Sequence, residues 1–413
     1  MNILFIYPPS VYLNHSMFKH FTYFSETVNL VANSGYDVSV LDCGVELFDR
    51  RTIYRQIKQS DVIVFIIEPY TINNTLSLSV IAKQLNSRCK IILYGTAAAL
   101  IPNYLSHITE IDYVVADGFF FEGISTALNM IRGVCSVSDS TNRDSQSKII
   151  FGSLFDKGKK WGNPISDLVP INKYQEYGNR MFEFTVQTGC PYNCSFCSEK
   201  ILFKSGKKRC FIQRPVDDII SVLSEAAPLF SSVYFSATTF TYDRDWVISI
   251  CEGMIREKIK LPWRSDTRID CLDKELIETM KKSGLKQLSI GIEAFEDSLL
   301  QTVNKGVSSG VMEETISLCQ RSGVSIKALL ILGIPGQTAD DIHHTQEVVK
   351  KLGIPYRWKE YSPIRELFEA DRRGDSIEDK LSAFDRSGFN ASSVEGINPE
   401  EYMSLLFPDN YYR

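Results

Sequence analysis

The sequence has no excess of positive charge and no hydrophobic segment long enough to cross a bilayer. Its 413 residues include 45 Lys and Arg against 50 Asp and Glu, which gives a net charge of −5. That balance argues against a large nucleic-acid interface, because such an interface requires a basic surface. No apolar run approaches the roughly 18 residues of a membrane-spanning helix. We therefore expect neither a nucleic-acid partner nor a membrane association.

A secretory signal is also missing from the sequence. The first ten residues, MNILFIYPPS, lack the basic start and the extended apolar core of a signal peptide. We therefore expect a cytoplasmic protein. In a reducing compartment its ten cysteines are not expected to form structural disulfides. A close group of them instead indicates a metal site.

The first 134 residues contain five short hydrophobic runs that are separated by helix-length segments. Runs of Val, Ile and Leu with this spacing are typical of a parallel sheet covered by helices on both faces. We therefore predict an α/β protein with an N-terminal doubly wound, Rossmann-like domain over residues 1–134. Such a domain binds its ligand beyond the carboxyl ends of the strands. The runs are 2–7, 37–42, 61–67, 90–94 and 111–115.

A second alternation of strand and helix patterns follows a connecting segment, 135–180, whose first part is rich in Ser, Asp and Asn. Six strand signals between residues 181 and 363 predict a partial (β/α)6 barrel of the TIM type. Barrels of this type carry their chemistry at the C-terminal ends of the strands. Residues 364–413 are polar and are expected to form a cap or tail. The strand signals are 182–187, 232–236, 262–266, 286–291, 325–332 and 354–360, with helices expected over 216–229 and 273–283.

Three cysteines lie close together directly after the first strand of this second array. Residues 190–197 read CPYNCSFC, so that Cys190, Cys194 and Cys197 fall at i, i+4 and i+7. Three thiolates on one short loop can bind three irons of a [4Fe–4S] cluster and leave the fourth iron open. An incomplete ligand set keeps room for a substrate, as in catalytic zinc sites.

Two simpler interpretations of these cysteines are a chance grouping and a zinc knuckle. A zinc site requires a fourth Cys or His nearby, usually in paired spacing. The nearest candidate is Cys210, and no histidine lies between His107 and His343. The spacing therefore favours the iron–sulfur cluster.

CxxxCxxC with an aromatic residue, Phe196, before the last cysteine resembles the signature of the radical S-adenosylmethionine (SAM) superfamily. In that family the open iron binds the amino and carboxylate groups of SAM. The cluster passes on an electron from a donor such as flavodoxin or ferredoxin, and SAM cleaves to a 5′-deoxyadenosyl radical. The resemblance implies that the three cysteines are the cluster ligands and that Phe196 lies beside the cofactors.

Two further segments resemble the same family. KKSGLKQLSIGIEAFEDSLLQTVNKG (281–306) is similar to its fourth-strand region, which implies that Glu293 lies near the SAM amino group. A carboxylate at a strand end can accept a charge-assisted hydrogen bond from an ammonium; a salt-bridged edge residue is the alternative. LLILGIPGQT (329–338) is similar to the fifth-strand turn, in which Gly333, Pro335 and Gly336 would let the backbone approach the adenine.

The third and second strands agree with the family to different degrees. Arg268, after Trp263 and Arg264, matches a recurrent third-strand arginine, which could reach the SAM carboxylate or the substrate; a solvated arginine is the alternative. The second strand carries Ala237 and Thr238 where the family usually has acidic residues. We therefore name Glu293 and Arg268 as catalytic candidates and infer no substrate contact from relatives.

A doubly wound domain before such a core resembles the cobalamin-binding subgroup of the superfamily. The resemblance implies that cobalamin lies at the carboxyl edge of the sheet, where the small residues Gly95, Thr96 and Ala97 would admit the corrin. The chain lacks a D-x-H-x-x-G element, so no histidine is proposed as a lower cobalt ligand. The other matching loops are Pro8–Tyr12, Cys43–Val45, Glu68–Thr75 and Asp117–Phe120.

Three functions follow from these observations. The first is a cobalamin-dependent radical SAM methyltransferase that acts on carbon or phosphorus of a small molecule. The second is a radical SAM dehydratase, epimerase or cyclase whose N-terminal domain does not use cobalamin. The third is a non-catalytic iron–sulfur or zinc module with a redox role. The matches in the fourth and fifth strands favour the first two over the third.

Overall fold

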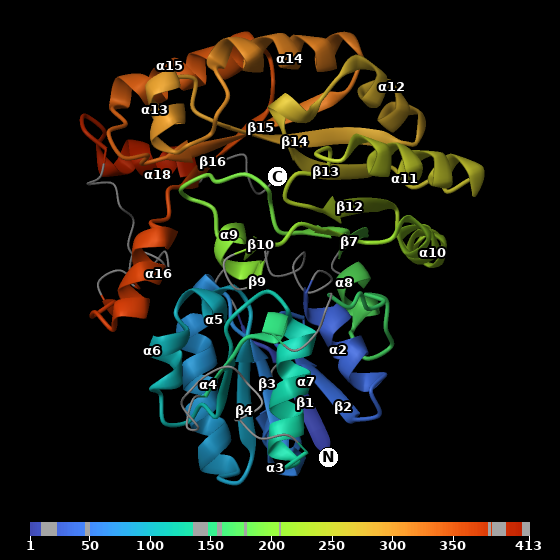
Figure 1. Cartoon of the computed structure of the whole chain (residues 1–413), viewed down its shortest axis with the longest axis vertical. Coiled ribbons are helices and arrows are strands. Elements are labelled where there is room, and N and C mark those ends of the chain that lie inside the picture. The colour runs from blue at the N-terminus through green and yellow to red at the C-terminus, as the bar shows by residue number, and fades with distance from the viewer. Residues whose placement is uncertain are drawn as a thin grey trace. The chain divides into compact units, whose positions relative to one another are not determined.

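The computed structural model describes residues 1–9, 23–45, 50–134, 148–154, 159–176, 180–205, 208–378, 381 and 394–406. Of the expected connecting segment 135–180, residues 135–147, 155–158 and 177–179 lie outside these residues, as do residues 10–12 of the first loop. The chain forms two compact units (Figure 1). Unit 1 comprises Met1–Pro191, Ser198–Ile212 and Ile364–Ser387, and unit 2 comprises Tyr192–Cys197, Gln213–Pro363 and Gly388–Arg413.

Unit 1 contains a six-stranded sheet with the order β2-β1-β3-β4-β5-β6, and all its neighbouring strands are parallel. This order confirms the predicted doubly wound fold. The five predicted runs correspond to β1 to β5, whereas the two-residue β6 was not expected. The strands are β1 (Asn2–Tyr7), β2 (Asp37–Asp42), β3 (Val62–Ile66), β4 (Lys90–Tyr94), β5 (Tyr113–Val115) and β6 (Ile149–Ile150).

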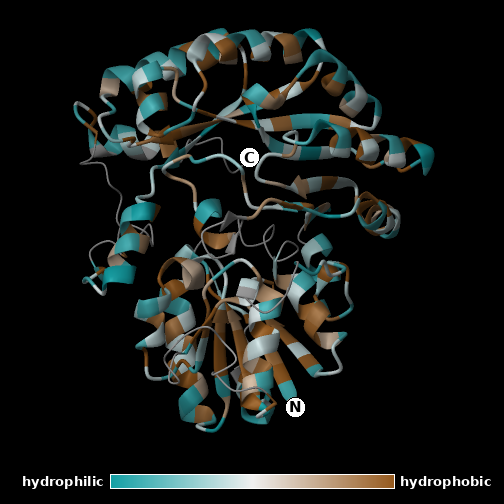
Figure 2. Cartoon of the chain, viewed as in Figure 1, coloured by the Kyte–Doolittle hydropathy of each residue, from teal (hydrophilic) through white to brown (hydrophobic). Residues whose placement is uncertain are grey.

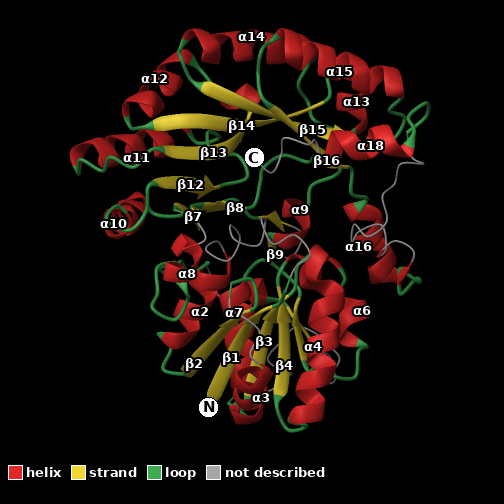
Figure 3. Ribbon diagram, turned by 180° about the vertical axis from the view of Figure 1, so that it is seen from behind, coloured by secondary structure: helices red, strands yellow, loops and turns green. Residues whose placement is uncertain are grey.

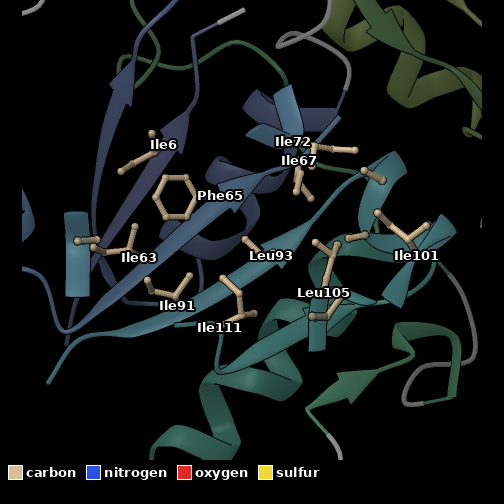
Figure 4. Packing of buried hydrophobic residues seen from close by; sticks show 14 of the residues in the cluster. Ile6, Ile63, Phe65, Ile67, Ile72, Ile91, Leu93, Ile101, Leu105 and Ile111 are labelled. Atoms are coloured by element: carbon tan, nitrogen blue, oxygen red, sulfur yellow. The ribbon is translucent and has the colours of Figure 1, made fainter. Parts of the chain in front are cut away.

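Alternate residues of the central strands pack into two separate cores. In β3, Ile63 and Phe65 face one hydrophobic cluster and Val62 and Val64 face the other, and all four are fully buried. Figure 4 shows the first cluster, in which side chains of the strands meet those of the covering helices. Burial on both faces explains why these strands are hydrophobic along their whole length, as Figure 2 shows.

The helices of unit 1 cover both faces of this sheet. Helix α16 belongs to unit 1 although it follows the second array, because Leu367 and Ala370 pack into the first cluster. The Asp371 carboxylate also accepts hydrogen bonds from the backbone N–H groups of Asn103 (3.0 Å) and Tyr104 (2.8 Å) at the start of α6. The elements are α2 (Ser25–Ala32), α3 (Arg50–Gln59), η2 (Pro69–Thr71), α4 (Ile72–Leu85), α5 (Thr96–Leu100), α6 (Pro102–Ser106), α7 (Phe120–Ile131), η4 (Gly152–Leu154), α8 (Ile171–Glu176), α9 (Glu199–Leu202) and α16 (Ile364–Arg373).

The second large sheet has the order β16-β15-β14-β13-β12-β7, with consecutive strands side by side (Figure 3). The pairs from β12 to β16 are parallel, and the predicted partial (β/α)6 barrel is confirmed. Its strands are β7 (Met181–Thr185), β12 (Ser232–Ser236), β13 (Trp263–Arg268), β14 (Leu285–Glu293), β15 (Ser325–Leu332) and β16 (Tyr356–Glu360). Shorter strands are β8 (Gln187–Thr188), β9 (Lys204–Ser205), β10 (Lys208–Arg209) and β11 (Ile212–Gln213).

Short polar residues start the helices that follow these strands. Asp273 caps α12 through the N–H of Leu276 (2.9 Å), and Thr338 and Asp341 form a capping box at the start of α15. These caps fix where α12 and α15 begin after β13 and β15. The elements are α10 (Val216–Ala226), α11 (Arg244–Arg256), η5 (Ile269–Cys271), α12 (Lys274–Lys282), α13 (Asp297–Thr302), α14 (Ser309–Arg321), α15 (Ala339–Lys351) and α18 (Pro399–Leu406).

Candidate functional site

The three cysteines lie on the loop between β8 and α9, and each is partly exposed. Gly189 immediately precedes them with a φ of 74°, and a Cβ at this position would lie 1.9 Å from the carbonyl oxygen of Cys210. Only glycine fits there, because both the backbone conformation and the close approach exclude a side chain. The Gly189 N–H also donates to the Glu199 carboxylate at 3.0 Å, which holds the start of the loop to α9.

The second half of the loop is fixed within unit 2. Phe196 packs against a hydrophobic cluster at the strand ends. The Ser195 N–H donates to the Val303 carbonyl at 3.0 Å. The Asn304 amide donates to the Asn193 carbonyl at 2.9 Å. The cluster beneath Phe196 consists of Ala294, Leu299, Val303, Ile331 and Ile334.

Arg268, at the end of β13, is buried and is not the solvated side chain that was the alternative. Its Nε and Nη2 donate to the two carboxylate oxygens of Asp270 at 2.9 and 3.0 Å. Nη2 also donates to the Lys305 carbonyl at 2.7 Å, and Nη1 lies 3.7 Å from the Cys194 sulfur. Burial alone would lower the pKa of Arg268, but Asp270 and Cys194 raise it above its ordinary value.

Glu293 forms a buried ion pair at the end of β14. Its Oε1 accepts a hydrogen bond from Lys305 Nζ at 2.7 Å. The residue has a φ of 67°, a conformation that is uncommon outside glycine, and it follows an irregularity in the pairing of β14 with β15. A strained residue at a strand end that nevertheless carries a carboxylate indicates a functional requirement for that side chain.

The turn after β15 leaves backbone accessible. Gly333 and Gly336 have φ values of 86° and 84°, and nothing lies within 4 Å of a Cβ added at Gly336. The Gln337 side chain closes the turn, because its Oε1 accepts from the Gly333 N–H at 2.7 Å. Pro335 and Gly336 are exposed, whereas Gly333 is buried, and the turn lies at the same end of the sheet as Glu293 and Arg268.

The inner face of the second sheet carries a group of charges. Side chains alternate along a strand, so Arg264 and Asp266 of β13 lie on the opposite face from the buried Ser265 and Thr267. Burial raises the pKa of Asp266, although Tyr234 and Ser289 form hydrogen bonds with its carboxylate. Burial and two neighbouring arginines lower the pKa of Lys327. The cations that interact with this group are Arg264, Lys327, Arg357 and Lys359.

In the part of the chain that is described, no group of three His, Cys, Asp or Glu side chains could hold a metal ion. The ligands of a single ion converge on it, whereas each thiolate of a cubane cluster binds an iron of its own. Three partly exposed thiols on a glycine-preceded loop fit such a cluster by the chemistry of their donor set.

Three small residues at the carboxyl edge of the first sheet were assigned to a corrin site, and packing explains the small size of two of them. A Cβ on Gly95 would lie 2.6 Å from the Ile67 carbonyl oxygen, and Ala97 packs into the first core, so both have structural reasons to be small. Thr96 alone is partly exposed. The buried Tyr94 hydroxyl has no hydrogen-bond partner among the described residues. An unsatisfied hydroxyl at this edge is compatible with a bound polar ligand.

Sequence reasoning did not identify four residues that complete these arrangements. Lys305 lies in the quoted fourth-strand segment, and Asp270 follows Arg268 by two residues; both pairings depend on the fold. Gln337 is the second-last residue of the quoted fifth-strand segment. Tyr192, inside the cysteine motif, has its ring 3.7 Å from the Arg268 guanidinium carbon. Only Asp270, a charged residue two positions from Arg268, offered a signal in the sequence.

Residues 184–349 match the sequence profile described as the radical SAM superfamily. This segment is a radical SAM domain. The matched range begins in β7 and ends in α15, so it contains the cysteine loop and the strand ends that carry Arg268, Glu293 and Gly333.

Two curated relatives are similar to this chain over most of its length. An uncharacterised methyltransferase of Pyrococcus horikoshii is 22% identical over 339 residues, which is 78% of this chain and 71% of the relative. An anaerobic magnesium-protoporphyrin IX monomethyl ester cyclase of Rubrivivax gelatinosus is 25% identical over 329 residues, 75% of this chain and 57% of the relative. The chain therefore spans little more than half of that cyclase.

Solved structures show the same two-part fold. The radical SAM methyltransferase TsrM of Kitasatospora setae, with cobalamin and a [4Fe–4S] cluster bound, superposes with a TM-score of 0.72 at 14% identity, over 88% of this chain and 76% of that chain. The cobalamin-dependent radical SAM enzyme OxsB gives 0.69 at 14% identity, over 95% and 58%. Within the described residues, no helix combines the length and the hydropathy needed to traverse a bilayer.

Proposed function

We propose that this chain is a cobalamin-dependent radical SAM methyltransferase that acts on a small molecule. The observation that carries the proposal is the order of its parts. A doubly wound sheet precedes a partial barrel, and the loop after the first barrel strand holds three cysteines. The structural similarity to TsrM extends over 88% of the chain, and it supports the assignment of both parts to one known type of fold.

Each group of site residues would have its own role. Cys190, Cys194 and Cys197 would hold a [4Fe–4S] cluster, which, when bound, supplies the electron that cleaves SAM to a 5′-deoxyadenosyl radical. Glu293 would accept a hydrogen bond from the SAM ammonium group. The turn at Gly333, Pro335 and Gly336 would face the adenine. These residues bind, orient and exclude water, and the cofactors supply the difficult chemistry.

The N-terminal sheet would hold cobalamin at its carboxyl edge, where Thr96 is accessible and the Tyr94 hydroxyl is unsatisfied. When bound, cobalamin would carry the methyl group that a second SAM provides. We further propose a cytoplasmic location, because thiols stay reduced in that compartment. The electron for the cluster would come from a donor such as flavodoxin or ferredoxin.

The charges on the inner face of the barrel favour an anionic small molecule as the substrate. Four cations, Arg264, Lys327, Arg357 and Lys359, interact around Asp266. Lys327→Gln should weaken the stabilisation of the protein by inorganic phosphate, measured as a shift of the unfolding midpoint at constant ionic strength. The control is Lys350→Gln on α15, an exposed lysine on a covering helix. Equal shifts in both variants would contradict an anion site.

The experiment that tests the proposal uses the anaerobically purified full chain with reconstituted cluster and added hydroxocobalamin. A corrin spectrum that survives desalting, with 5′-deoxyadenosine formed from SAM, is the expected result. SAM with a deuterated methyl group then reports whether a small-molecule acceptor gains the label. A brown protein that forms 5′-deoxyadenosine but retains no corrin would overturn the cobalamin assignment.

A second candidate is a cyclisation or related rearrangement that transfers no methyl group, because the likeness to the Rubrivivax gelatinosus cyclase covers 75% of this chain. In that case the deuterated methyl group would remain in the methionine product, while hydrogen abstraction by the radical would continue. The labelled-methyl experiment therefore separates the two candidates.

A further inference from the structure

The Arg268 guanidinium is held rigidly inside unit 2. Both oxygens of Asp270 accept from it at 2.9 and 3.0 Å, and the Lys305 carbonyl accepts a third hydrogen bond at 2.7 Å. The Tyr192 ring covers one face of the guanidinium, with its centroid 3.7 Å from the Arg268 Cζ. A planar fork with two hydrogen-bonded edges and a stacked face has little freedom to rotate.

The edge of the guanidinium that remains points to a cysteine sulfur. Nη1 of Arg268 lies 3.7 Å from Sγ of Cys194, within the range for a hydrogen bond to sulfur. The side chain is only 6% exposed, so water does not screen this contact strongly. Asp270 offsets part of the positive charge, but it lies on the Nε and Nη2 edge, and the sulfur faces Nη1.

Nearby residues fix Tyr192 and so preserve the stacking. Its hydroxyl is 3.2 Å from the Cys271 sulfur, and its ring meets Tyr242 edge-on at 5.8 Å. Tyr192 also lies within the cysteine motif, two residues before Cys194. Residues of β13, of η5 and of the loop itself therefore hold one guanidinium against one thiol.

We propose that Arg268 is a positioning residue that donates a hydrogen bond to the Cys194 thiolate and so raises the reduction potential of the [4Fe–4S] cluster. This inference rests on the proposed function, because it requires the cluster to be bound by these cysteines. Asp270 and Lys305 occupy the N–H of Nε and both N–H groups of Nη2, so one N–H of Nη1 remains for a further acceptor such as the SAM carboxylate.

The direction of the effect follows from charge. Reduction adds one electron from an external low-potential donor to the cluster, so the reduced form carries more negative charge on its sulfurs. A fixed cationic donor stabilises that form more than the oxidised form. Hydrogen bonds to cluster sulfurs and net charge are among the factors that set such potentials. Loss of Arg268 should therefore make the cluster harder to reduce.

The test is an EPR-monitored redox titration of the reconstituted full chain without SAM. For Arg268→Gln we expect the ratio of reduced to oxidised cluster at a given potential to fall about tenfold, a shift of roughly 59 mV for one electron. Arg268→Lys should shift the midpoint in the same direction by less, because an ammonium keeps the charge but cannot hold both Asp270 and the sulfur.

Arg244→Gln is the matched control, since Arg244 also pairs with two carboxylates, Asp273 and Glu275, but on the surface of unit 2. Its midpoint should equal that of the wild type. Unchanged midpoints in both Arg268 variants at full cluster loading would overturn the inference. If Arg268→Gln does not bind a cluster, the midpoint of Arg268→Lys alone tests the inference. A wild type that binds no cluster would refute the proposed function instead.

Discussion

Lys305 Nζ donates a 2.7 Å hydrogen bond to Glu293 Oε1, and their side chains are only 4% and 7% exposed. Removing one partner of a buried ion pair leaves the other charge uncompensated, at a cost of about 3–5 kcal/mol. We therefore predict that Glu293→Gln lowers the free energy of unfolding by about this amount and also weakens SAM binding. Denaturant unfolding and equilibrium dialysis with labelled SAM measure the two effects.

The double variant Glu293→Gln with Lys305→Met separates stability from ligand binding. With both charges gone, the free energy of unfolding should recover by a few kcal/mol relative to either single variant. SAM affinity should stay low, because no carboxylate faces the ammonium. A double variant that binds SAM like the wild type would contradict the role of Glu293.

Cys194→Ala should abolish iron loading, because the other two thiolates then lack a third partner on the loop. Cys251→Ala is the matched control, since Cys251 is a fully buried cysteine on α11 with no role in the motif. Iron and sulfide contents and the visible spectrum after anaerobic reconstitution measure the difference. Equal iron in the two variants would refute the ligand assignment.

Hydrophobic periodicity predicted most of the fold. The runs at 2–7, 37–42 and 90–94 coincide with β1, β2 and β4, because these strands are bounded by turns and, where central, buried on both faces. The two-residue β6 was missed, since Ile149–Ile150 is too short to show a pattern. Helix α10 ends at Ala226, three residues before the predicted end.

The site was less predictable than the fold, for a physical reason. The sequence indicated Arg268 and Glu293 by resemblance, but their partners are decided by tertiary structure. Lys305 lies 12 residues from Glu293, and it faces the carboxylate only because α13 brings the chain back to the end of β14. The contact between Arg268 and Cys194 spans 74 residues, and no local pattern encodes it.

Asp117 predicts a pH dependence of stability in unit 1. Burial raises the pKa of this carboxyl to about 6 from 3.8, even though backbone N–H groups of Phe119, Gly152 and Ser153 donate to it. Between these pH values the folded chain keeps a proton that the unfolded chain releases, so stability falls as pH rises. The fall amounts to about 3 kcal/mol for a shift of about two units.

Asp117→Asn removes this titration. The difference in free energy of unfolding between the wild type and the variant should decrease from pH 4 to pH 6 and stay constant above about pH 7. Chemical denaturation at a series of pH values measures it. Parallel curves for the two proteins over that interval would show that Asp117 does not titrate there.

Gly189 and Gly353 offer a matched pair of glycines. Both have positive φ, 74° and 64°, so alanine introduces backbone strain of about 1 kcal/mol at either position. A Cβ at Gly353 meets nothing within 4 Å, whereas one at Gly189 would lie 1.9 Å from the Cys210 carbonyl oxygen. Gly189→Ala must therefore displace the chain directly before Cys190. We predict normal iron loading in Gly353→Ala and strongly reduced loading in Gly189→Ala. Equal iron contents would mean that the loop tolerates the displacement and that Gly189 does not fix the position of Cys190.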